Sequence, residues 1–363
     1  MMMKAITANR MTVTRLLNLS LGRSLGQGCD IQDVPRPSIT DNEILVRVKA
    51  VALNPTDYKH IDVLSPRNSI IGCDYAGEVV EVGKKALGDW KVGDRVAGMV
   101  HGGLYRDRGA FAEYLKVDGD LAWKIPAEMS NEEATTYGVS AVTAMLALNV
   151  HLRVPWADEV GKARQEASSQ AFPIFIYSGA TSAGLFAIQL AKAAGCTVVT
   201  TASPRSFDLV KRYGADRVFN YLSPTAVAEI TREFPNITSA VDCFAEGGST
   251  DFCANVIKNQ GGKVVTLLDR GKSKIQGVEY ELILAYTLFG RPFEFLQPIG
   301  PKFEAKPSDR KALARFYTSL PQVIKHLKPA PIRLIDGGFD GILIGVDKLR
   351  KGEASGGKFV VTI

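Results

Sequence analysis

The stretch from Pro173 to Thr201, PIFIYSGATSAGLFAIQLAKAAGCTVVTT, decides the fold of the central part of this chain. It opens with an apolar run, Pro173 to Tyr177, and continues through a Gly/Ser/Thr turn into an Ala- and Leu-rich run from Leu185 to Ala194. Gly195 ends that helical run, and a second apolar run from Cys196 to Thr201 follows it. A strand, a helix and a strand within about 30 residues predict a βαβ unit and therefore a parallel sheet.

The same alternation continues beyond this stretch, which predicts a doubly wound α/β domain of roughly 160 residues. The expected elements are a helix from Phe207 to Tyr213 and strands at Arg217–Asn220, Ser239–Cys243 and Lys263–Leu267. A basic helix (308–327) and a terminal strand (358–363) come later, and we expect that strand to return to the first domain.

Residues 43 to 125 read as β structure, because short alternating runs lie between Gly, Asp and Pro turns. This pattern predicts a compact, barrel-like first domain. After Pro126 the pattern changes: Ser130 and Glu133 form the signature of a helix start, and the helix should run to about Leu148. The polar stretch from Val154 to Ala171 is expected to be an inserted loop.

The N-terminal 29 residues contain four basic residues and no acidic one. We expect a strand from Lys4 to Ala8 and then a poorly ordered insertion, while a mitochondrial transit peptide is the alternative interpretation. No apolar run approaches the ~20 residues of a membrane helix, so the chain is not expected to span a bilayer. A cytoplasmic location is the expectation, because the use of cysteine is typical of a reducing compartment.

The composition excludes several classes of protein. A chain of 363 residues with 46% hydrophobic and 23% charged residues is typical of a globular protein with about two domains. The net charge of +6 is too small over this length to indicate nucleic-acid binding. The five cysteines are odd in number and lack a Cys-x-x-Cys motif, which indicates free thiols.

The turn from Tyr177 to Gly184 lies where the pyrophosphate of a dinucleotide would meet a helix N-terminus. It is not a G-x-G-x-x-G motif, and the hydroxyls of Thr181 and Ser182 are expected to donate hydrogen bonds to phosphate instead. The next strand ends at Thr200-Thr-Ala-Ser-Pro-Arg-Ser206 without the acidic residue that an NAD site needs. Ser203, Arg205 and Ser206 suit a 2′-phosphate, so NADP is the predicted cofactor. The alternative interpretation of this segment is an ordinary polar loop.

A catalytic zinc is not expected, because the four histidines are scattered and no three ligands converge in the pattern. Cys73 is interpreted as a small buried hydrophobe and His60 as a surface residue. The polar cluster Asn54-Pro-Thr-Asp-Tyr-Lys59 follows a strong alternating strand and is a candidate site edge, while Asp57 is also suited to cap the next helix.

These landmarks together resemble a known family. Asn54-Pro-Thr-Asp-Tyr-Lys59, Gly72-Cys-Asp-Tyr-Ala-Gly77, Val92-Gly-Asp-Arg-Val96, Gly109-Ala-Phe-Ala-Glu-Tyr114 and Lys124-Ile-Pro126 occur in the order of the zinc-free, quinone-oxidoreductase-like medium-chain dehydrogenase/reductases. Ser203-Pro-Arg-Ser-Phe-Asp-Leu-Val-Lys211, Gly214-Ala-Asp-Arg-Val-Phe-Asn-Tyr221 and Lys351-Gly-Glu-Ala-Ser-Gly-Gly-Lys358 resemble the fungal trans-acting enoyl reductases of polyketide clusters.

The resemblance implies an α/β fold with a GroES-like β-barrel catalytic domain and a doubly wound Rossmann domain, and an active site in the cleft at their junction. The implied boundaries are 1–135 for the GroES-like part, 136–300 for the NADP-binding domain and 301–363 for the return to the catalytic domain. In the family's alcohol dehydrogenases a zinc-binding Cys stands at the position of Asn54, and Gly-His-Glu stands where this chain has Gly72-Cys73-Asp74.

The resemblance also implies the residues of the site. Tyr58 and Lys59 are the candidate catalytic donors. The cofactor-binding residues would be Thr56, Asp57, Tyr58, Lys59, Ala180, Thr181, Ser182, Ala183, Ser203, Pro204, Arg205, Ser206, Tyr221, Thr266, Leu267, Ala354 and Ser355. The substrate-binding residues would be Gly138, Val139, Ser140, Ala141, Val142, Thr143, Ala144, Met145, Ala285, Tyr286, Thr287, Leu288 and Phe289.

Three functions remain open at this point. The first is an NADPH-dependent trans-acting enoyl reductase that works on a polyketide held by the carrier domain of a partner synthase, with the reductase itself a monomer or a dimer. The second is a stand-alone NADPH quinone or enone reductase, and the third is a non-redox, cyclase-like protein. Between Lys302 and Lys328 there are seven basic and two acidic residues, a candidate docking patch for an acidic carrier domain or simply a solvated helix face.

Overall fold

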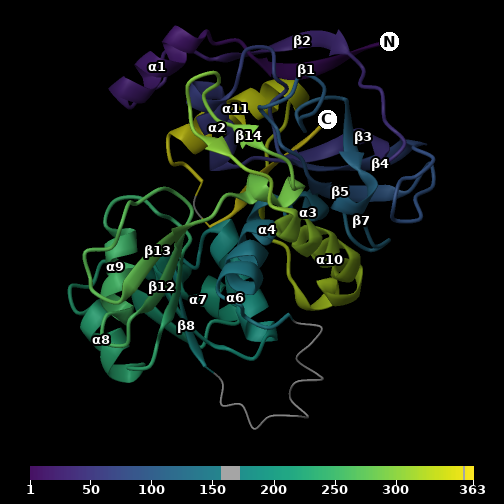
Figure 1. Ribbon diagram of the computed structural model, residues 1–363. Helices are drawn as coiled ribbons and strands as arrows, with labels where there is room; N and C mark the ends of the chain where they lie inside the picture. Colours follow the sequence, from purple (N-terminus) through teal and green to yellow (C-terminus); the bar gives the residue numbers. More distant parts are fainter. Residues whose placement is uncertain (157–171, 355) are drawn as a thin grey trace. The chain divides into compact units, whose positions relative to one another are not determined.

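The computed structural model describes residues 1–156, 172–354 and 356–363 (Figure 1). These residues form two compact units. Unit 1 contains Met1–Val139, Tyr286–Gln322 and Pro331–Ile363, and unit 2 contains Ser140–Ala285 and Val323–Ala330. Residues 286–300, expected with the nucleotide-binding domain, therefore pack within unit 1, and residues 323–330 pack within unit 2.

Unit 2 is built on a six-stranded sheet in which every pair of neighbours is parallel. The strand order is β10-β9-β8-β11-β12-β13, the 3-2-1-4-5-6 order of a Rossmann fold. The expected doubly wound sheet is confirmed, and β13 is a sixth strand that the sequence pattern did not reveal. The strands are β8 (Pro173–Tyr177), β9 (Thr197–Ala202), β10 (Arg217–Asn220), β11 (Ser239–Asp242), β12 (Gly262–Thr266) and β13 (Val278–Leu282).

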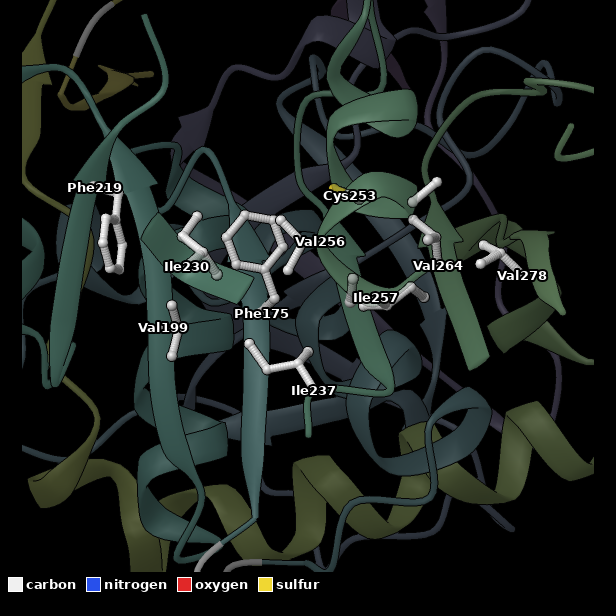
Figure 2. Close-up of a cluster of buried hydrophobic side chains, with 12 residues drawn as sticks. Phe175, Val199, Phe219, Ile230, Ile237, Cys253, Val256, Ile257, Val264 and Val278 are labelled. Carbon is white, nitrogen blue, oxygen red and sulfur yellow. The ribbon is translucent and has the colours of Figure 1, made fainter. Parts of the chain in front are cut away.

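The helices of unit 2 bury one face of this sheet in a hydrophobic core. Figure 2 shows Phe175 and Val199 from the strands packed with Ile230 of α8 and Val256 and Ile257 of α9. These β-branched and aromatic residues alternate along the strands, as a half-buried sheet face requires. The helices described after residue 171 are α6 (Ser182–Ala193), α7 (Phe207–Arg212), α8 (Ala226–Glu233) and α9 (Ser249–Ile257), with short turns at Pro204–Ser206 (η4) and Ile324–His326 (η6).

Unit 1 is organised around a seven-stranded sheet with the order β16-β17-β3-β4-β5-β7, and β6 also pairs with β3. Among the described residues no strand pairing closes this sheet into a barrel. The last strand pairs antiparallel with β3, so the expected return of the C-terminus is confirmed. The strands are β3 (Glu43–Ala52), β4 (Asp74–Val82), β5 (Arg95–Met99), β6 (Tyr114–Asp118), β7 (Ala122–Lys124), β16 (Ile332–Leu334) and β17 (Lys358–Thr362).

The N-terminal segment is folded, so the expected poorly ordered insertion is wrong. β1 (Met2–Ala8) pairs along its whole length with β2 (Cys29–Pro35), and α1 (Thr12–Leu21) lies between them in sequence. The pairing of β1 with β2 holds both ends of the insertion, and hydrogen bonds of the buried Arg15 and Asn18 side chains hold α1 between them.

The helix expected from Ser130 to about Leu148 is broken into three pieces. They are α3 (Asn131–Thr135), α4 (Val139–Met145) and the π-helical turn η3 (Leu146–His151). Gly138 lies at the break, where a Cβ would come within 2.2 Å of Asp74 Oδ1. Most of the expected loop from Val154 to Ala171 lies outside the described residues.

The capping box at the start of α3 is confirmed. Ser130 Oγ accepts a hydrogen bond from Glu133 N at 3.1 Å, and the Glu133 carboxylate accepts one from Ser130 N at 3.0 Å. We expect Ser130→Ala to lower the free energy of unfolding by about 1 kcal/mol, because the N–H group of Glu133 loses its side-chain acceptor. Urea denaturation measures this loss. Ser20→Ala on α1, a surface serine that caps nothing, should change the stability by less than about 0.5 kcal/mol.

The remaining helices and short strands of unit 1 lie between the strands of its sheet in the sequence. No helix within the described residues is long and apolar enough to cross a membrane. The elements are α2 (Pro55–Lys59), the π-helical turn η1 (His60–Leu64), η2 (Gly119–Leu121), η5 (Ala285–Phe289, which begins at the unit boundary), β14 (Phe293–Glu294), β15 (Lys302–Phe303), α10 (Pro307–Val323) and α11 (Gly338–Arg350).

Candidate functional site

The predicted nucleotide-binding segments of unit 2 all follow the carboxyl ends of its strands. Because the strands are parallel, these ends share one edge of the sheet. The order of the strands reverses between β8 and β11, so the switch point of the sheet lies beside the turn after β8. The segments at this edge are Ala180–Ala183 after β8, Ser203–Ser206 after β9, Tyr221 after β10 and Thr266–Leu267 at β12.

The turn after β8 is shaped by two glycines. A Cβ on Gly179 would come within 2.2 Å of Thr200 Oγ1, and one on Gly184 would come within 2.5 Å of Ser178 O. These close approaches pack the start of α6 against β8 and β9, which is the role of the first and third glycines of a dinucleotide fingerprint. The turn therefore keeps the backbone path of that fingerprint although its middle glycine is Thr181.

The hydroxyl of Thr181 is used inside the turn, which differs from the phosphate-donor role that we expected for it. Its O–H group donates to Ser178 O at 2.9 Å, and its oxygen accepts from Gly184 N at 3.1 Å, so Thr181 caps α6. The first N–H groups of the helix, those of Ser182 and Ala183, have no acceptor within the helix. These N–H groups and the positive end of the α6 dipole fit a phosphate group.

The segment after β9 forms a short polar turn. Ser203 precedes a 3-10 turn at Pro204–Ser206, and the hydroxyls of Ser203 and Ser206 lie 3.3 Å apart. Arg205 is exposed. Tyr221, which follows the neighbouring strand β10, is partly exposed, and its ring centre lies 6.2 Å from that of Tyr177. Hydroxyls and a guanidinium within one short turn suit a phosphate monoester.

In unit 1 the candidate catalytic segment is the short helix α2. Asn54 is its N-cap, and the Asp57 carboxylate accepts a hydrogen bond from Asn54 N at 2.7 Å. The expected capping role of Asp57 is confirmed. Burial raises the pKa of Asp57 to about 7. Tyr58 and Lys59 follow on the same helix and are both half-buried, so their backbone positions are fixed by a capped and buried turn.

A buried ion pair connects α2 to two other segments. Lys358 Nζ lies 3.2 Å from Asp74 Oδ2, with the two side chains 4% and 0% exposed, and also donates to Asn54 Oδ1. Asn54 Nδ2 donates to Asp74 Oδ2 at 2.9 Å, and Val139 N donates to Asp74 Oδ1 at 2.7 Å. Burial raises the pKa of Asp74, and the ammonium of Lys358 opposes this shift.

Sequence reasoning missed the roles of Asp74 and Lys358. The available signal was a charged residue at the edge of an otherwise apolar run, in Gly72-Cys-Asp-Tyr-Ala-Gly77 and in Lys358-Phe-Val-Val361. Such a residue is rarely buried unless it is paired. The sequence could not show that these two runs lie on either side of β3.

The predicted substrate-binding residues Tyr286 to Phe289 pack within unit 1 beside α2. Tyr286 Oη lies 2.7 Å from Thr56 Oγ1 and 3.6 Å from Cys73 Sγ. His60 is buried rather than on the surface, because η1 turns its ring against those of Tyr286 and His101. Burial lowers the pKa of His60 to about 4, so this histidine is neutral.

The other predicted residues are spread over the two units. Gly138 and Val139 lie against Asp74 in unit 1. Ser140 to Met145 and Ala285 belong to unit 2. Ala354 is half-buried in unit 1, and Ser355 lies outside the described residues.

The residues around α2 do not fit a metal ion. No group of three His, Cys, Asp or Glu side chains that could hold a metal is found within the described parts of the chain. Burial raises the pKa of the Cys73 thiol well above its ordinary value, and Asp74 is already paired with an ammonium group. A zinc ligand must be a thiolate, a neutral imidazole or an available carboxylate.

The candidate basic patch from Lys302 to Lys328 is divided between the two units. Arg310 Nη1 and Nη2 lie 2.8 and 2.6 Å from carboxylate oxygens of Asp118 and Asp120. This arginine therefore holds α10 against the end of β6. Lys325 and Lys328 belong to unit 2, whereas most of α10 belongs to unit 1.

Comparison with known proteins agrees with both units. The alcohol dehydrogenase GroES-like domain matches residues 40–127, and the zinc-binding dehydrogenase family matches residues 183–276. The trans-enoyl reductase caaB of Aspergillus niger is 37% identical over 349 residues, which cover 93% of this chain and 94% of that protein. The chain belongs to the trans-enoyl reductase family.

Other members and structures extend this likeness. The trans-enoyl reductase buaC of Petromyces alliaceus is 36% identical over 90% of this chain and 92% of its own length. Among solved structures, the CurK enoyl reductase has a TM-score of 0.71 and 19% identity, with 99% of each chain covered. That structure supports the fold of this trans-enoyl reductase family member. Enzymes of the wider family use a nicotinamide nucleotide.

Proposed function

We propose that this chain is an NADPH-dependent trans-acting enoyl reductase that reduces an α,β-unsaturated thioester held by a partner polyketide synthase. The observation that carries the proposal is the 37% identity to a trans-enoyl reductase over nearly the whole of both chains. The α6 N-terminus and the Ser203–Ser206 turn support a phosphorylated dinucleotide. The capped helix α2 supplies polar side chains in the unit that carries the substrate segment Tyr286–Phe289.

The reaction adds two hydrogens across a C=C bond that is conjugated to the thioester carbonyl. When bound, the reduced nicotinamide supplies the hydride, which adds to Cβ of the substrate. Negative charge then develops on the thioester oxygen, and Cα takes up a proton. The protein must therefore place hydrogen-bond donors near that oxygen and a proton source near Cα.

Tyr58 and Lys59 are proposed as these donors, because their hydroxyl and ammonium are donors of the capped helix α2, where the third donor, the hydroxyl of Thr56, already contacts Tyr286. The buried ion pair of Asp74 and Lys358 holds the N-cap residue Asn54, which fixes where α2 begins. The hydroxyl of Thr56 forms a hydrogen bond with that of Tyr286, so the distance between α2 and the substrate segment is fixed. A fixed donor position costs no reorganisation when charge develops.

Arg205→Ala is expected to remove most of the preference for NADPH over NADH. A guanidinium that pairs with the 2′-phosphate contributes ~1.5–3 kcal/mol, so the NADPH dissociation constant should rise by about 10- to 150-fold. NADH binding should not change, because it lacks that phosphate. Fluorescence titration of both nucleotides against wild type and variant measures the effect. Lys211→Ala, a basic residue on the following helix α7, is the control, and equal wild-type affinities for NADPH and NADH would refute the prediction.

The proposed activity is tested by following NADPH consumption with a crotonyl thioester and with a quinone. Reduction of the thioester with formation of the saturated butyryl product supports the proposal. Turnover of the quinone alone would identify a stand-alone quinone reductase. NADPH binding without consumption of either substrate would identify a protein of this fold that does not transfer hydride.

A further inference from the structure

Helix α1 packs on unit 1 with its polar side rather than its apolar side. Arg15 and Asn18 are both buried. Arg15 Nη2 donates to Gln297 O at 2.7 Å, and Asn18 Nδ2 donates to Asp62 O at 2.8 Å. A surface helix of a globular protein normally buries its apolar stripe and exposes its polar one. In α1 the arrangement is reversed.

The reversed packing leaves an apolar face toward solvent. Val13, Leu16, Leu17 and Leu21 follow the i, i+3, i+4, i+8 spacing of one helix face, and they are 38% to 69% exposed. We call these four residues the outer face of α1. Figure 1 shows α1 at the outer edge of unit 1, away from the seven-stranded sheet. A contiguous exposed apolar face of this kind marks an interaction site.

The size of the outer face argues against a stable homodimer formed through it. A helix of ten residues is about 15 Å long. A stable interface buries about 800 Å² on each partner, which is more than one side of three turns supplies. A short apolar face is suited to a transient contact with another protein.

The positive charge around the outer face indicates an acidic partner. Residues 1 to 29 contain no acidic side chain. Arg23, just after α1, and Arg67 are both exposed, and Arg67 Nη1 lies 3.5 Å from Met11 Sδ at the start of the helix. A partner with acidic side chains around an apolar centre would complement this surface.

We propose that the outer face of α1 docks the acidic acyl carrier domain that delivers the substrate; this inference rests on the trans-acting function proposed above. Docking there would place the carrier against the unit that holds Tyr58 and Lys59. Helix α1 also contacts η1, which continues directly from α2, and Arg10 of the same segment lies 3.5 Å from Asp62 Oδ1. The docking helix and the candidate catalytic helix are therefore joined through one buried turn.

The test compares a free and a carrier-bound substrate in the double variant Leu16→Glu/Leu17→Glu. The probes are a small crotonyl thioester and the acyl carrier domain of a fungal reducing polyketide synthase loaded with crotonyl-phosphopantetheine. We expect kcat/KM for the carrier-bound substrate to fall by about tenfold or more, since two apolar contacts become two charges that repel an acidic partner. Turnover of the free thioester should stay within twofold of wild type. Ile344→Glu, an equally exposed apolar position on α11, is the matched control and should change neither substrate.

Each other result overturns the inference in a distinguishable way. Equal turnover of the carrier-bound substrate by wild type and the double variant would place docking elsewhere. If the wild type reduces the free thioester but not the carrier-bound one, the protein is an enoyl reductase and the carrier domain is not its docking partner. A wild type that reduces neither would refute the proposed function itself. Sedimentation with phosphatidylserine vesicles that is lost in the double variant would identify a membrane surface as the occupant instead.

Discussion

Lys358→Met is expected to lower the free energy of unfolding by about 3–5 kcal/mol at neutral pH, because it leaves the Asp74 carboxylate buried without its counter-charge. Both side chains are almost fully buried, so water cannot replace the lost ammonium. Asn54 also loses a hydrogen bond from Lys358 Nζ. The loss should therefore reach α2, and thermal or urea unfolding measures it.

The pH dependence of this loss gives a signature that a simple packing defect would not produce. Burial already raises the folded-state pKa of Asp74, and removal of the ammonium raises that pKa further. Below ~4, the ordinary pKa of an unfolded Asp, the carboxyl is protonated in both states and the variant loses least stability. As the pH rises through the folded pKa, the variant must bury an unpaired charge, so its loss relative to wild type grows.

A double variant separates the ion pair from the packing of the two side chains. Asp74→Asn/Lys358→Met buries neither charge and should recover most of the stability lost by Lys358→Met alone. If the double variant is no more stable than the single one, or if the loss does not grow with pH, the pair does not act in this way.

Tyr58→Phe and Lys59→Ala are expected to lower kcat for the crotonyl thioester, by about 10²- to 10⁴-fold for whichever residue supplies the proton to Cα. The residue that only holds the thioester oxygen should have the smaller effect. Both variants keep the Asn54–Asp57 capping box, so α2 should remain folded. Single-turnover reduction followed by NADPH absorbance measures the chemical step.

The controls for this prediction are chosen on the same unit. Lys91→Ala removes an exposed lysine and should leave kcat unchanged. Retention of wild-type kcat by both Tyr58→Phe and Lys59→Ala would show that neither residue takes part in the chemistry. Unchanged NADPH affinity in both variants would show that any loss lies in the reaction rather than in cofactor binding.

The sequence by itself determined the alternation of strands and helices that builds unit 2. Apolar runs such as Pro173–Tyr177 and Cys196–Thr201 are too short for helices and are separated by a helical run that Gly195 ends, so a parallel sheet follows from local rules. The same holds for the Ser130–Glu133 capping box and for the Asp57 cap, because both depend on residues three positions apart.

Only the tertiary structure decided which side chains meet. Lys358 and Asp74 are 284 positions apart, and their ion pair exists because β17 and β4 lie on either side of β3. Thr181 carries a hydroxyl that could donate a hydrogen bond to phosphate, yet this hydroxyl forms its hydrogen bonds within the turn. Helical spacing indicates an apolar stripe in α1. That stripe faces solvent, because hydrogen bonds to Gln297 and Asp62 from distant segments bury the polar side of the helix. Local sequence sets the backbone path, and the pairing of distant segments sets burial, charge and hydrogen bonding.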